Sequence, residues 1–282
     1  AATEVGLKER TPVIAGGGDQ AMAAIGNGVI SSGKISSTIG TGGQLFAHLD
    51  EVIVDTELRT HTFCHGFPGK WFIMGAILSA GLSLRWFRDN IGGNVNSYEL
   101  LSGEAEKGEP GCEGLIFLPY LVGERTPHMN PEARGVFFGL TLRHKRHHLV
   151  RAIMEGAAFA LRDCLEIFKE LGVNVEKIVA SGGGARSKLW CQIQADVFNS
   201  EIMLTNTREQ AAFGAALLAG FGVGVYKNIE ETCGNIISFD QHISPIAKNV
   251  RRYNESYRIY RSIYKDLKDD FHRLAEVNSN GM

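Results

Sequence analysis

Three glycine-rich segments, each beside an apolar run typical of a strand, constrain the fold of this chain most. They are AGGGDQ (15–20), IGTGGQ (39–44) and ASGGGARS (180–187). Consecutive glycines cost conformational entropy, so they mark places where the backbone turns sharply or where another group approaches it closely. Amides left uncovered in such turns can converge on phosphate oxygens, and a helix that begins there adds its dipole. One such turn is common in tight packing, but three in one chain favour a nucleotide-binding protein.

The runs between these turns predict an α/β domain with a mixed β-sheet flanked by helices. Apolar and β-branched runs alternate with stretches of helical spacing, and glycines separate them. We expect strands at 12–15, 35–39, 44–47, 60–64, 71–76, 175–180 and 202–204, and helices at 79–91, 148–171, 188–198 and 209–222. The first hairpin would turn at GTGG.

The stretch 246–276 is expected to form a terminal amphipathic helix. Its apolar residues recur at alternating steps of four and three: Tyr253, Tyr257, Tyr260, Tyr264, Leu267, Phe271 and Leu274. Such a stripe indicates one buried helix face. Docking against the same domain is the simpler interpretation, and self-association as a homodimer is the alternative.

Charge and cysteine content argue against several classes of partner. The chain has 29 basic and 31 acidic residues, a net charge of -2, which gives no attraction to nucleic acid or to an anionic membrane. Its five cysteines are widely spaced, without a zinc-binding pattern, which favours a reducing cytoplasm and predicts no metal centre built by the protein. No apolar run approaches the roughly 18 residues of a membrane span, and the first residues lack the apolar core of a signal peptide.

Several longer motifs resemble one family in their order along the chain. They are AGGGDQAMAAIGNGV, STIGTGGQLF, FLPYLVGERTPHMNPEARGVFFGL, ASGGGARSKLWCQIQADVFNSEI and EQAAFGAALLAG. From about Thr11 to about Tyr226 the chain resembles the carboxyl-terminal half of the FGGY carbohydrate kinases, xylulokinases most of all. The resemblance implies an actin-like ATPase (ribonuclease H-like) fold. It also implies that 1–282 is the carboxyl-terminal domain of a sugar kinase whose amino-terminal domain is absent.

The resemblance implies ATP-dependent phosphorylation of a ketose, D-xylulose to D-xylulose 5-phosphate, with Mg2+ held mainly by the ATP phosphates. Asp19 matches the catalytic base, which accepts the proton of the attacking sugar hydroxyl. Gln20 matches a sugar-binding residue. Without the partner domain that excludes water, the isolated domain is expected to show little or no turnover. Asp19 as a plain helix cap is the alternative.

The nucleotide site is implied in the same way. Gly40 and Thr41 match the turn around the outer phosphates, with their amides and the Thr41 hydroxyl as donors. Gly42 stands where many xylulokinases have serine. Gly81 matches a nucleotide-contacting glycine, and Gly183, Gly184 and Ala185 match the turn under adenosine. The small residues of EQAAFGAALLAG would pack closely beneath that turn.

Other motifs have less specific interpretations. Arg85 is expected to be solvated rather than bound to phosphate. Glu124 and Arg125 of GERTP are expected to pair with each other, and RHKRHH (143–148) is expected to be a solvated charge run. Gluconate, ribulose or glycerol could replace xylulose as substrate. An actin- or chaperone-type nucleotide-binding module and a catalytically silent scaffold are the alternatives from other classes.

Overall fold

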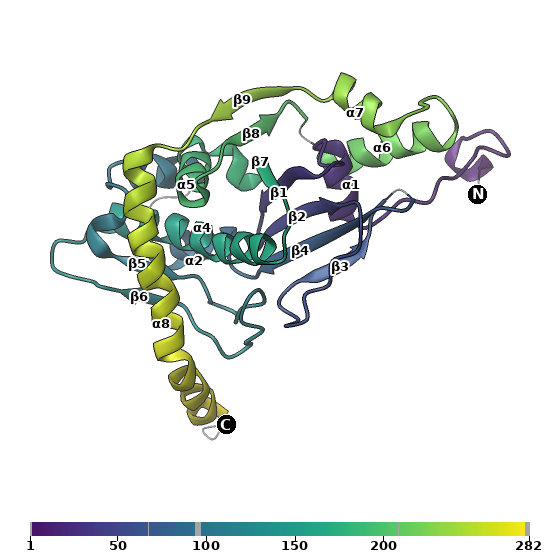
Figure 1. Cartoon of the computed structure of the whole chain (residues 1–282). Helices are drawn as coiled ribbons and strands as arrows, with labels where there is room; N and C mark the ends of the chain where they lie inside the picture. The colour runs from purple at the N-terminus through teal and green to yellow at the C-terminus, as the bar shows by residue number, and fades with distance from the viewer. Residues whose placement is uncertain (1, 67, 94–96, 208, 280–282) are drawn as a thin grey trace.

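The computed structural model of the chain describes residues 2–66, 68–93, 97–207 and 209–279 (Figure 1). The strands are β1 (Gly33–Ile39), β2 (Gly43–Leu49), β3 (His61–Cys64), β4 (Trp71–Ile77), β5 (Ile116–Leu118), β6 (Val136–Phe138), β7 (Val175–Gly182), β8 (Ile202–Thr205) and β9 (Phe239–Ile243). The α-helices are α1 (Asp19–Gly26), α2 (Gly81–Asn90), α3 (Tyr98–Ala105), α4 (Arg146–Glu170), α5 (Lys188–Phe198), α6 (Gln210–Gly222), α7 (Ile229–Ile236) and α8 (Ala247–Ser279). Short 3-10 turns lie at Thr3–Val5, Cys112–Gly114 and Gly183–Arg186.

Seven strands form one mixed sheet, in the order β3-β4-β2-β1-β7-β8-β9. β1, β7 and β8 are parallel, and the remaining neighbours pair antiparallel. β5 and β6 form a separate two-stranded sheet. The mixed α/β architecture predicted from the sequence is thereby confirmed. In the β1–β7 register Ile39 lies beside Gly182, so both strands end at the same edge of the sheet, each directly before a glycine turn.

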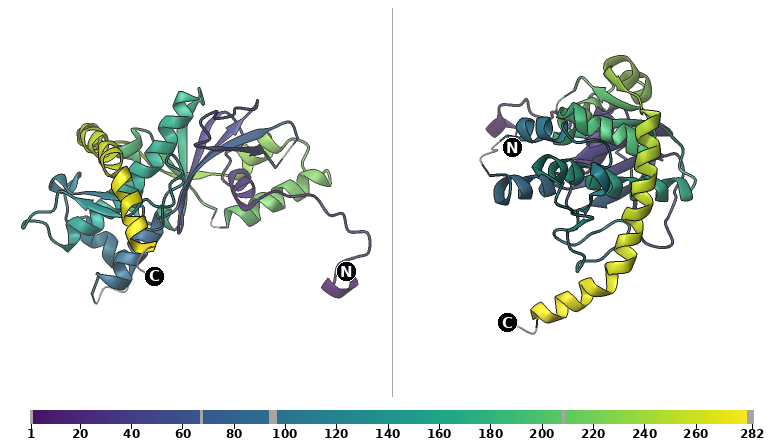
Figure 2. Two further views of the ribbon diagram at one scale, coloured as in Figure 1. Left: turned by 90° about the horizontal axis from the view of Figure 1, so that it is seen from below. Right: turned by 90° about the vertical axis from the view of Figure 1, so that its left-hand side faces the viewer.

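Helices cover both faces of the sheet, and Figure 2 shows the sheet between the two layers. On one face, α1, α6 and α7 enclose a core with Phe46, Phe72 and Val179 of the sheet. On the other face, α2, α3, α4, α5 and α8 enclose a larger core that includes Leu45 and Ala47. Successive side chains of a strand point to opposite faces, and β2 therefore contributes to both cores.

The terminal helix α8 lies against the larger layer with the predicted stripe inward. Tyr253, Tyr257, Tyr260 and Tyr264 are all buried, whereas Leu274 near the end of the helix is 48% exposed. The Tyr253 hydroxyl donates to Glu155 of α4 at 2.7 Å. The structure therefore favours docking within the domain for most of the stripe, and Figure 1 shows the last turns extending away from the other elements.

One expected strand is absent from the described sheet, and three observed elements were not expected. The run 12–15 is not a strand, because no strand of the described sheet pairs with it, and Val13 is 93% exposed. The elements α3, α7 and β9 were not predicted from the sequence. Among the described residues, no helix is both long enough and apolar enough to cross a membrane.

Candidate functional site

The loop between β1 and β2 forms a tight turn against the first residues of α2. The Gly81 N–H donates to the Gly40 carbonyl at 3.0 Å, and the Leu82 N–H donates to the Thr41 carbonyl at 2.9 Å. These two amides at the start of α2, which have no partner within the helix, are thereby satisfied by the turn. A Cβ atom on Gly81 would lie 2.2 Å from the Gly40 oxygen, so this close approach requires glycine.

These hydrogen bonds fix the direction of the amides in the turn. In a trans peptide the C=O and N–H groups point to opposite sides, and the peptides of the turn are trans. Because the carbonyls of Gly40 and Thr41 face α2, the N–H groups of Thr41 and Gly42 point away from it. Neither N–H group, nor the exposed Thr41 hydroxyl, has a hydrogen-bond partner within the part of the chain that the structure describes. The turn therefore presents donors on its open side.

The outward hydrogen-bond donors of the turn are not the two amides expected from the sequence, those of Gly40 and Thr41. The Gly40 N–H donates to the Gly42 carbonyl at 2.9 Å, so it is used inside the turn. The Gly42 N–H takes its place as the second outward donor. A Cβ atom on Gly42 would lie 2.6 Å from the Ile77 oxygen, which gives a steric reason for glycine rather than serine in this chain.

The turn after β7 packs on the last residue of β1. A Cβ atom on Gly182 would lie 2.6 Å from the Ile39 oxygen, and one on Gly184 would lie 2.6 Å from the Ile39 Cβ atom. Gly183 is exposed and Ala185 is half-buried. The turns 40–42 and 182–185 therefore lie at the same end of two adjacent parallel strands, with α2 closing the other side of the first turn.

Asp19 and Gln20 begin α1, in the other helical layer. The N-cap of α1 is Gly18, and no side chain caps the helix. The Asp19 side chain is exposed, and its Oδ1 atom accepts a hydrogen bond from the Gln20 N–H at 2.8 Å. Asp19 is thus the first helical residue rather than the cap, where the helix dipole favours a carboxylate. No hydrogen bond among the described residues joins the Asp19 side chain to the turns 40–42 and 182–185.

The position of α1 is set by α6. A Cβ atom on Gly26 would lie 2.0 Å from the Gln210 oxygen, and one on Gly214 would lie 1.9 Å from the Met22 oxygen. The small residues of α6 therefore let two helix backbones approach closely. They pack against the helix that carries Asp19, and the expectation that they lie beneath the turn 183–185 is not met.

The side chains of Glu124 and Arg125 diverge, so they do not form the expected ion pair. The Arg125 guanidinium reaches Nε2 of His61 at 2.7 Å. Glu124 is only 2% exposed, and its Oε1 atom accepts the Arg125 backbone N–H at 2.8 Å. Burial raises the pKa of Glu124 to about 8.

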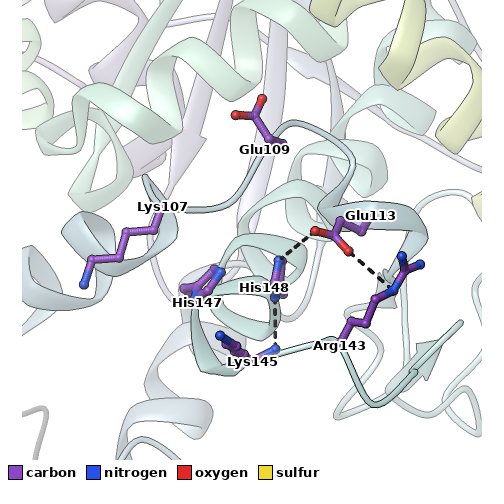
Figure 3. A pocket seen from close by; sticks show the side chains of 7 residues that line it. All are labelled: Lys107, Glu109, Glu113, Arg143, Lys145, His147 and His148. Carbon is purple, nitrogen blue, oxygen red and sulfur yellow. Dashed lines mark hydrogen bonds and ion pairs between the residues drawn. The ribbon is translucent and has the colours of Figure 1, made fainter.

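The basic run 143–148 borders a hollow at the start of α4 (Figure 3). The hollow is lined by Lys107, Glu109, Glu113, Arg143, Lys145, His147 and His148. Within it, the Glu113 carboxylate lies 4.0 Å from Arg143 Nε and 3.8 Å from His148 Nε2. His148 also accepts the Lys145 N–H at 2.9 Å through Nδ1. The run therefore takes part in the start of α4, and two of its side chains lie within ion-pair distance of Glu113.

Two further expectations concern charged ligands. Arg85 is exposed on α2, as a solvated arginine would be. Among the residues that the structure describes, no cluster of three or more His, Cys, Asp and Glu side chains has the arrangement of a metal site.

Residues 35–223 match the family described as "FGGY family of carbohydrate kinases, C-terminal domain". The chain is 41% identical to a xylulose kinase of Bacillus subtilis over 268 residues, covering 95% of the chain and 54% of that protein. It is 32% identical to a gluconokinase of the same organism, covering 98% of the chain and 55% of that protein. The chain thus spans about half the length of these relatives.

Solved structures give the same result for the fold. A xyloylose kinase from Brucella ovis superposes with a TM-score of 0.87 at 34% identity, covering 95% of this chain and 55% of that one. A ligand-bound xylulose kinase from Lactobacillus acidophilus superposes with a TM-score of 0.90 at 26% identity, covering 97% of this chain and 55% of that one. The actin-like fold expected from the sequence is thereby confirmed.

Proposed function

Because this chain belongs to the FGGY family of carbohydrate kinases, we propose that the protein containing it transfers a phosphoryl group from ATP to D-xylulose. The chain would be the nucleotide-binding, carboxyl-terminal half, and a further amino-terminal domain would complete the sugar pocket. The similarity to xylulose kinases along 95% of the chain supports the substrate. The chain's span of about half of those relatives supports the two-domain arrangement.

The observation that carries the proposal is the pair of outward N–H groups on Thr41 and Gly42. Backbone donors in a glycine turn suit the outer phosphates of ATP, because no side chain blocks the approach of the phosphate. The turn 183–185, at the end of the neighbouring parallel strand, would support the adenosine. Gly81 contributes by letting α2 close against the phosphate turn.

The residues present suit Mg2+ bound as part of a metal–nucleotide complex. Mg2+ dehydrates reluctantly and is commonly held by substrate phosphates and water, so such an ion would need few ligands from the chain. When bound, Mg2+ neutralises charge that develops on the transferred phosphoryl group. The chain's own contribution there is the donors of the turn 40–42.

Asp19 is proposed as the general base and Gln20 as a sugar contact. Phosphoryl transfer needs a carboxylate that accepts the proton of the attacking hydroxyl, and Asp19 presents an exposed carboxylate at the start of α1. The tight packing of α1 on α6 fixes its position. An exposed base is surrounded by water, so efficient transfer requires a second wall over Asp19. The chain alone is therefore expected to bind nucleotide and to turn over little.

The test is sugar-dependent ADP release by the full-length protein, with D-xylulose and gluconate assayed side by side. The gluconokinase relative makes gluconate the most informative competitor. A kcat/KM for D-xylulose at least about tenfold above that for gluconate, a difference of about 1.4 kcal/mol, supports the proposed substrate. A higher kcat/KM for gluconate would support the proposed kinase activity and would replace D-xylulose by gluconate as the substrate. ATP turnover that no sugar stimulates would remove the kinase proposal.

A further inference from the structure

The buried carboxyl group of Glu124 lies beside the end of β4, where the chain turns toward α2. Its Oε1 atom accepts the Leu78 N–H at 2.9 Å, in addition to the Arg125 N–H. Leu78 follows the last residue of β4 and precedes the start of α2 by three positions. Glu124 thus holds the connection that leads directly to Gly81.

The loop that carries Glu124 continues the sheet along β4. β3 pairs with β4 only as far as Met74. Beyond that point, the Thr126 N–H donates to the Ala76 carbonyl at 3.0 Å, and the Thr126 hydroxyl accepts the Ala76 N–H at 3.2 Å. Just beyond the end of β4, the Glu124 side chain accepts a hydrogen bond from the Leu78 N–H. The loop replaces β3 as the neighbour of the strand just before the strand ends.

This contact is coupled to the proposed phosphate turn by backbone alone. Leu78 leads to α2, whose first two N–H groups donate to the Gly40 and Thr41 carbonyls. These carbonyls set the direction of the outward amides, and at Gly81 the two backbones are so close that no side chain fits between them. A shift at Leu78 therefore has no loose segment in which to be absorbed before it reaches the turn.

From this chain of contacts we infer that Glu124 is a positioning residue for the nucleotide-binding turn, acting through the Leu78 N–H and the start of α2. The inference rests on the proposed function, because it concerns the same site. Glu124 touches neither nucleotide nor sugar. Its role is to keep the N–H groups of Thr41 and Gly42 aimed at the outer phosphates.

The side chain itself fits this role. The Oε2 atom of Glu124 is buried and has no hydrogen-bond partner in the described residues, so Oε1 alone makes the two backbone contacts. Glutamine has the same shape and keeps a carbonyl oxygen for both N–H groups. Glu124→Gln should therefore preserve the turn, and Glu124→Ala should release it.

Asp196 supplies a matched control. It is also 2% exposed, and its Oδ1 atom accepts a backbone N–H, that of Ile246, at 2.7 Å. Its Oδ2 atom accepts from Asn249 of α8 at 2.8 Å. Asp196→Ala thus removes a buried carboxylate of comparable burial that anchors the start of α8 instead of α2.

The experiment measures ATP affinity and amide hydrogen exchange on the full-length protein for the wild type, Glu124→Ala, Glu124→Gln and Asp196→Ala. We expect Glu124→Ala to weaken ATP binding at least about tenfold and to speed exchange at Gly81 and Leu82. Glu124→Gln should restore both, and Asp196→Ala should change neither, although its melting temperature falls. The KM for the sugar should stay within about twofold.

Two results would overturn the inference: equal loss of ATP affinity in Glu124→Ala and Asp196→Ala, or unchanged exchange at Gly81 and Leu82 in Glu124→Ala. A wild type that binds no ATP would remove the proposed function instead. In that case the exchange data still decide whether Glu124 positions the turn.

Discussion

The amide nitrogen of Gly81 lies 3.0 Å from the carbonyl oxygen of Gly40, although the two residues are 41 positions apart in the chain. The contact joins the start of α2 to the turn between β1 and β2. Since a Cβ atom on Gly81 would lie 2.2 Å from that oxygen, the two segments are held together only while position 81 is glycine.

Gly81→Ala should therefore weaken ATP binding. The methyl group would push α2 away from the turn and redirect the Thr41 and Gly42 amides. Overpacking of this kind costs about 1–3 kcal/mol, and we expect ATP affinity to fall at least about tenfold. Titration calorimetry with ATP on the full-length protein checks this. Gly103→Ala is the control, because position 103 of α3 has open space around it. Equal affinity in both variants would contradict the prediction.

Asp19→Asn should strongly reduce phosphorylation without loss of fold. The carboxylate is exposed and accepts only the neighbouring Gln20 N–H, which an asparagine oxygen can also accept. General-base catalysis contributes about 10²–10⁴-fold, so kcat should fall by at least about 10²-fold while ATP affinity is kept. Steady-state kinetics and ATP titration on the full-length protein provide the two measurements. Retained turnover would leave Asp19 with only a role in the first turn of α1.

The sequence predicts well those features that depend on local pattern. The helix at 188–198 has the predicted bounds, because Ser187 caps it and its apolar residues keep helical spacing. The predicted hairpin around GTGG is also confirmed, because the strands on either side of this glycine turn pair antiparallel. The run 12–15 was wrongly predicted as a strand, since an apolar run cannot indicate whether a neighbouring strand is available to pair with it.

The sequence was enough to predict which segments form the candidate site, but not the directions of their N–H groups or the contacts between them. Three glycine turns could be identified from sequence, yet the use of the Gly40 N–H inside its own turn depends on backbone angles. The role of Gly42 as a donor follows only once the carbonyls of the turn are seen to face α2. Glu124 was visible only as part of a motif, because its partner Leu78 lies 46 positions away.

Gly214→Ala should destabilise the protein and lower activity. The added methyl group would lie 1.9 Å from the Met22 oxygen and separate α6 from α1, which carries Asp19. We expect the free energy of unfolding to fall by about 1–3 kcal/mol. Gly234→Ala in α7 is the matched control, because nothing lies near its Cβ position. There the better helix propensity of alanine should add up to about 1 kcal/mol. Denaturant unfolding of both variants is the measurement, and losses of equal size would refute this account of the α1–α6 contact.

The contribution of Glu124 to stability should fall as the pH rises from 5 to 8.5. Burial raises its pKa to about 8 from an ordinary value of 4.5. A carboxyl with a raised pKa in the folded state contributes its full stability below pH 4.5 and loses it as the pH rises through 8. Burial raises the pKa of Asp163 to about 7, with the same sign.

The Glu124→Gln variant isolates this effect. Glutamine resembles the protonated acid, so variant and wild type should unfold with similar free energies at pH 5. The variant should gain on the wild type by about 1.4 kcal/mol for each pKa unit of the shift that the pH range crosses. Urea unfolding at pH 5, 7 and 8.5 checks the trend, and a constant difference across the range would be evidence against a raised pKa.

The ion pair between Arg151 and Glu155 should behave differently from the pairs at the surface. Both side chains are buried, with Arg151 Nε 2.8 Å from Glu155 Oε1, and the Tyr253 hydroxyl donates to the same oxygen. Glu155→Ala leaves a buried guanidinium without its carboxylate, which costs about 3–5 kcal/mol. Replacing both partners with apolar residues, Arg151→Met with Glu155→Leu, should cost less, because no charge stays buried. Thermal unfolding of the two variants distinguishes these cases. If the double variant loses more stability than Glu155→Ala, the attraction within the pair, rather than the cost of the unpaired charge, accounts for the effect. The pair would then stabilise the packing of α4 against α8 through the Tyr253 hydroxyl.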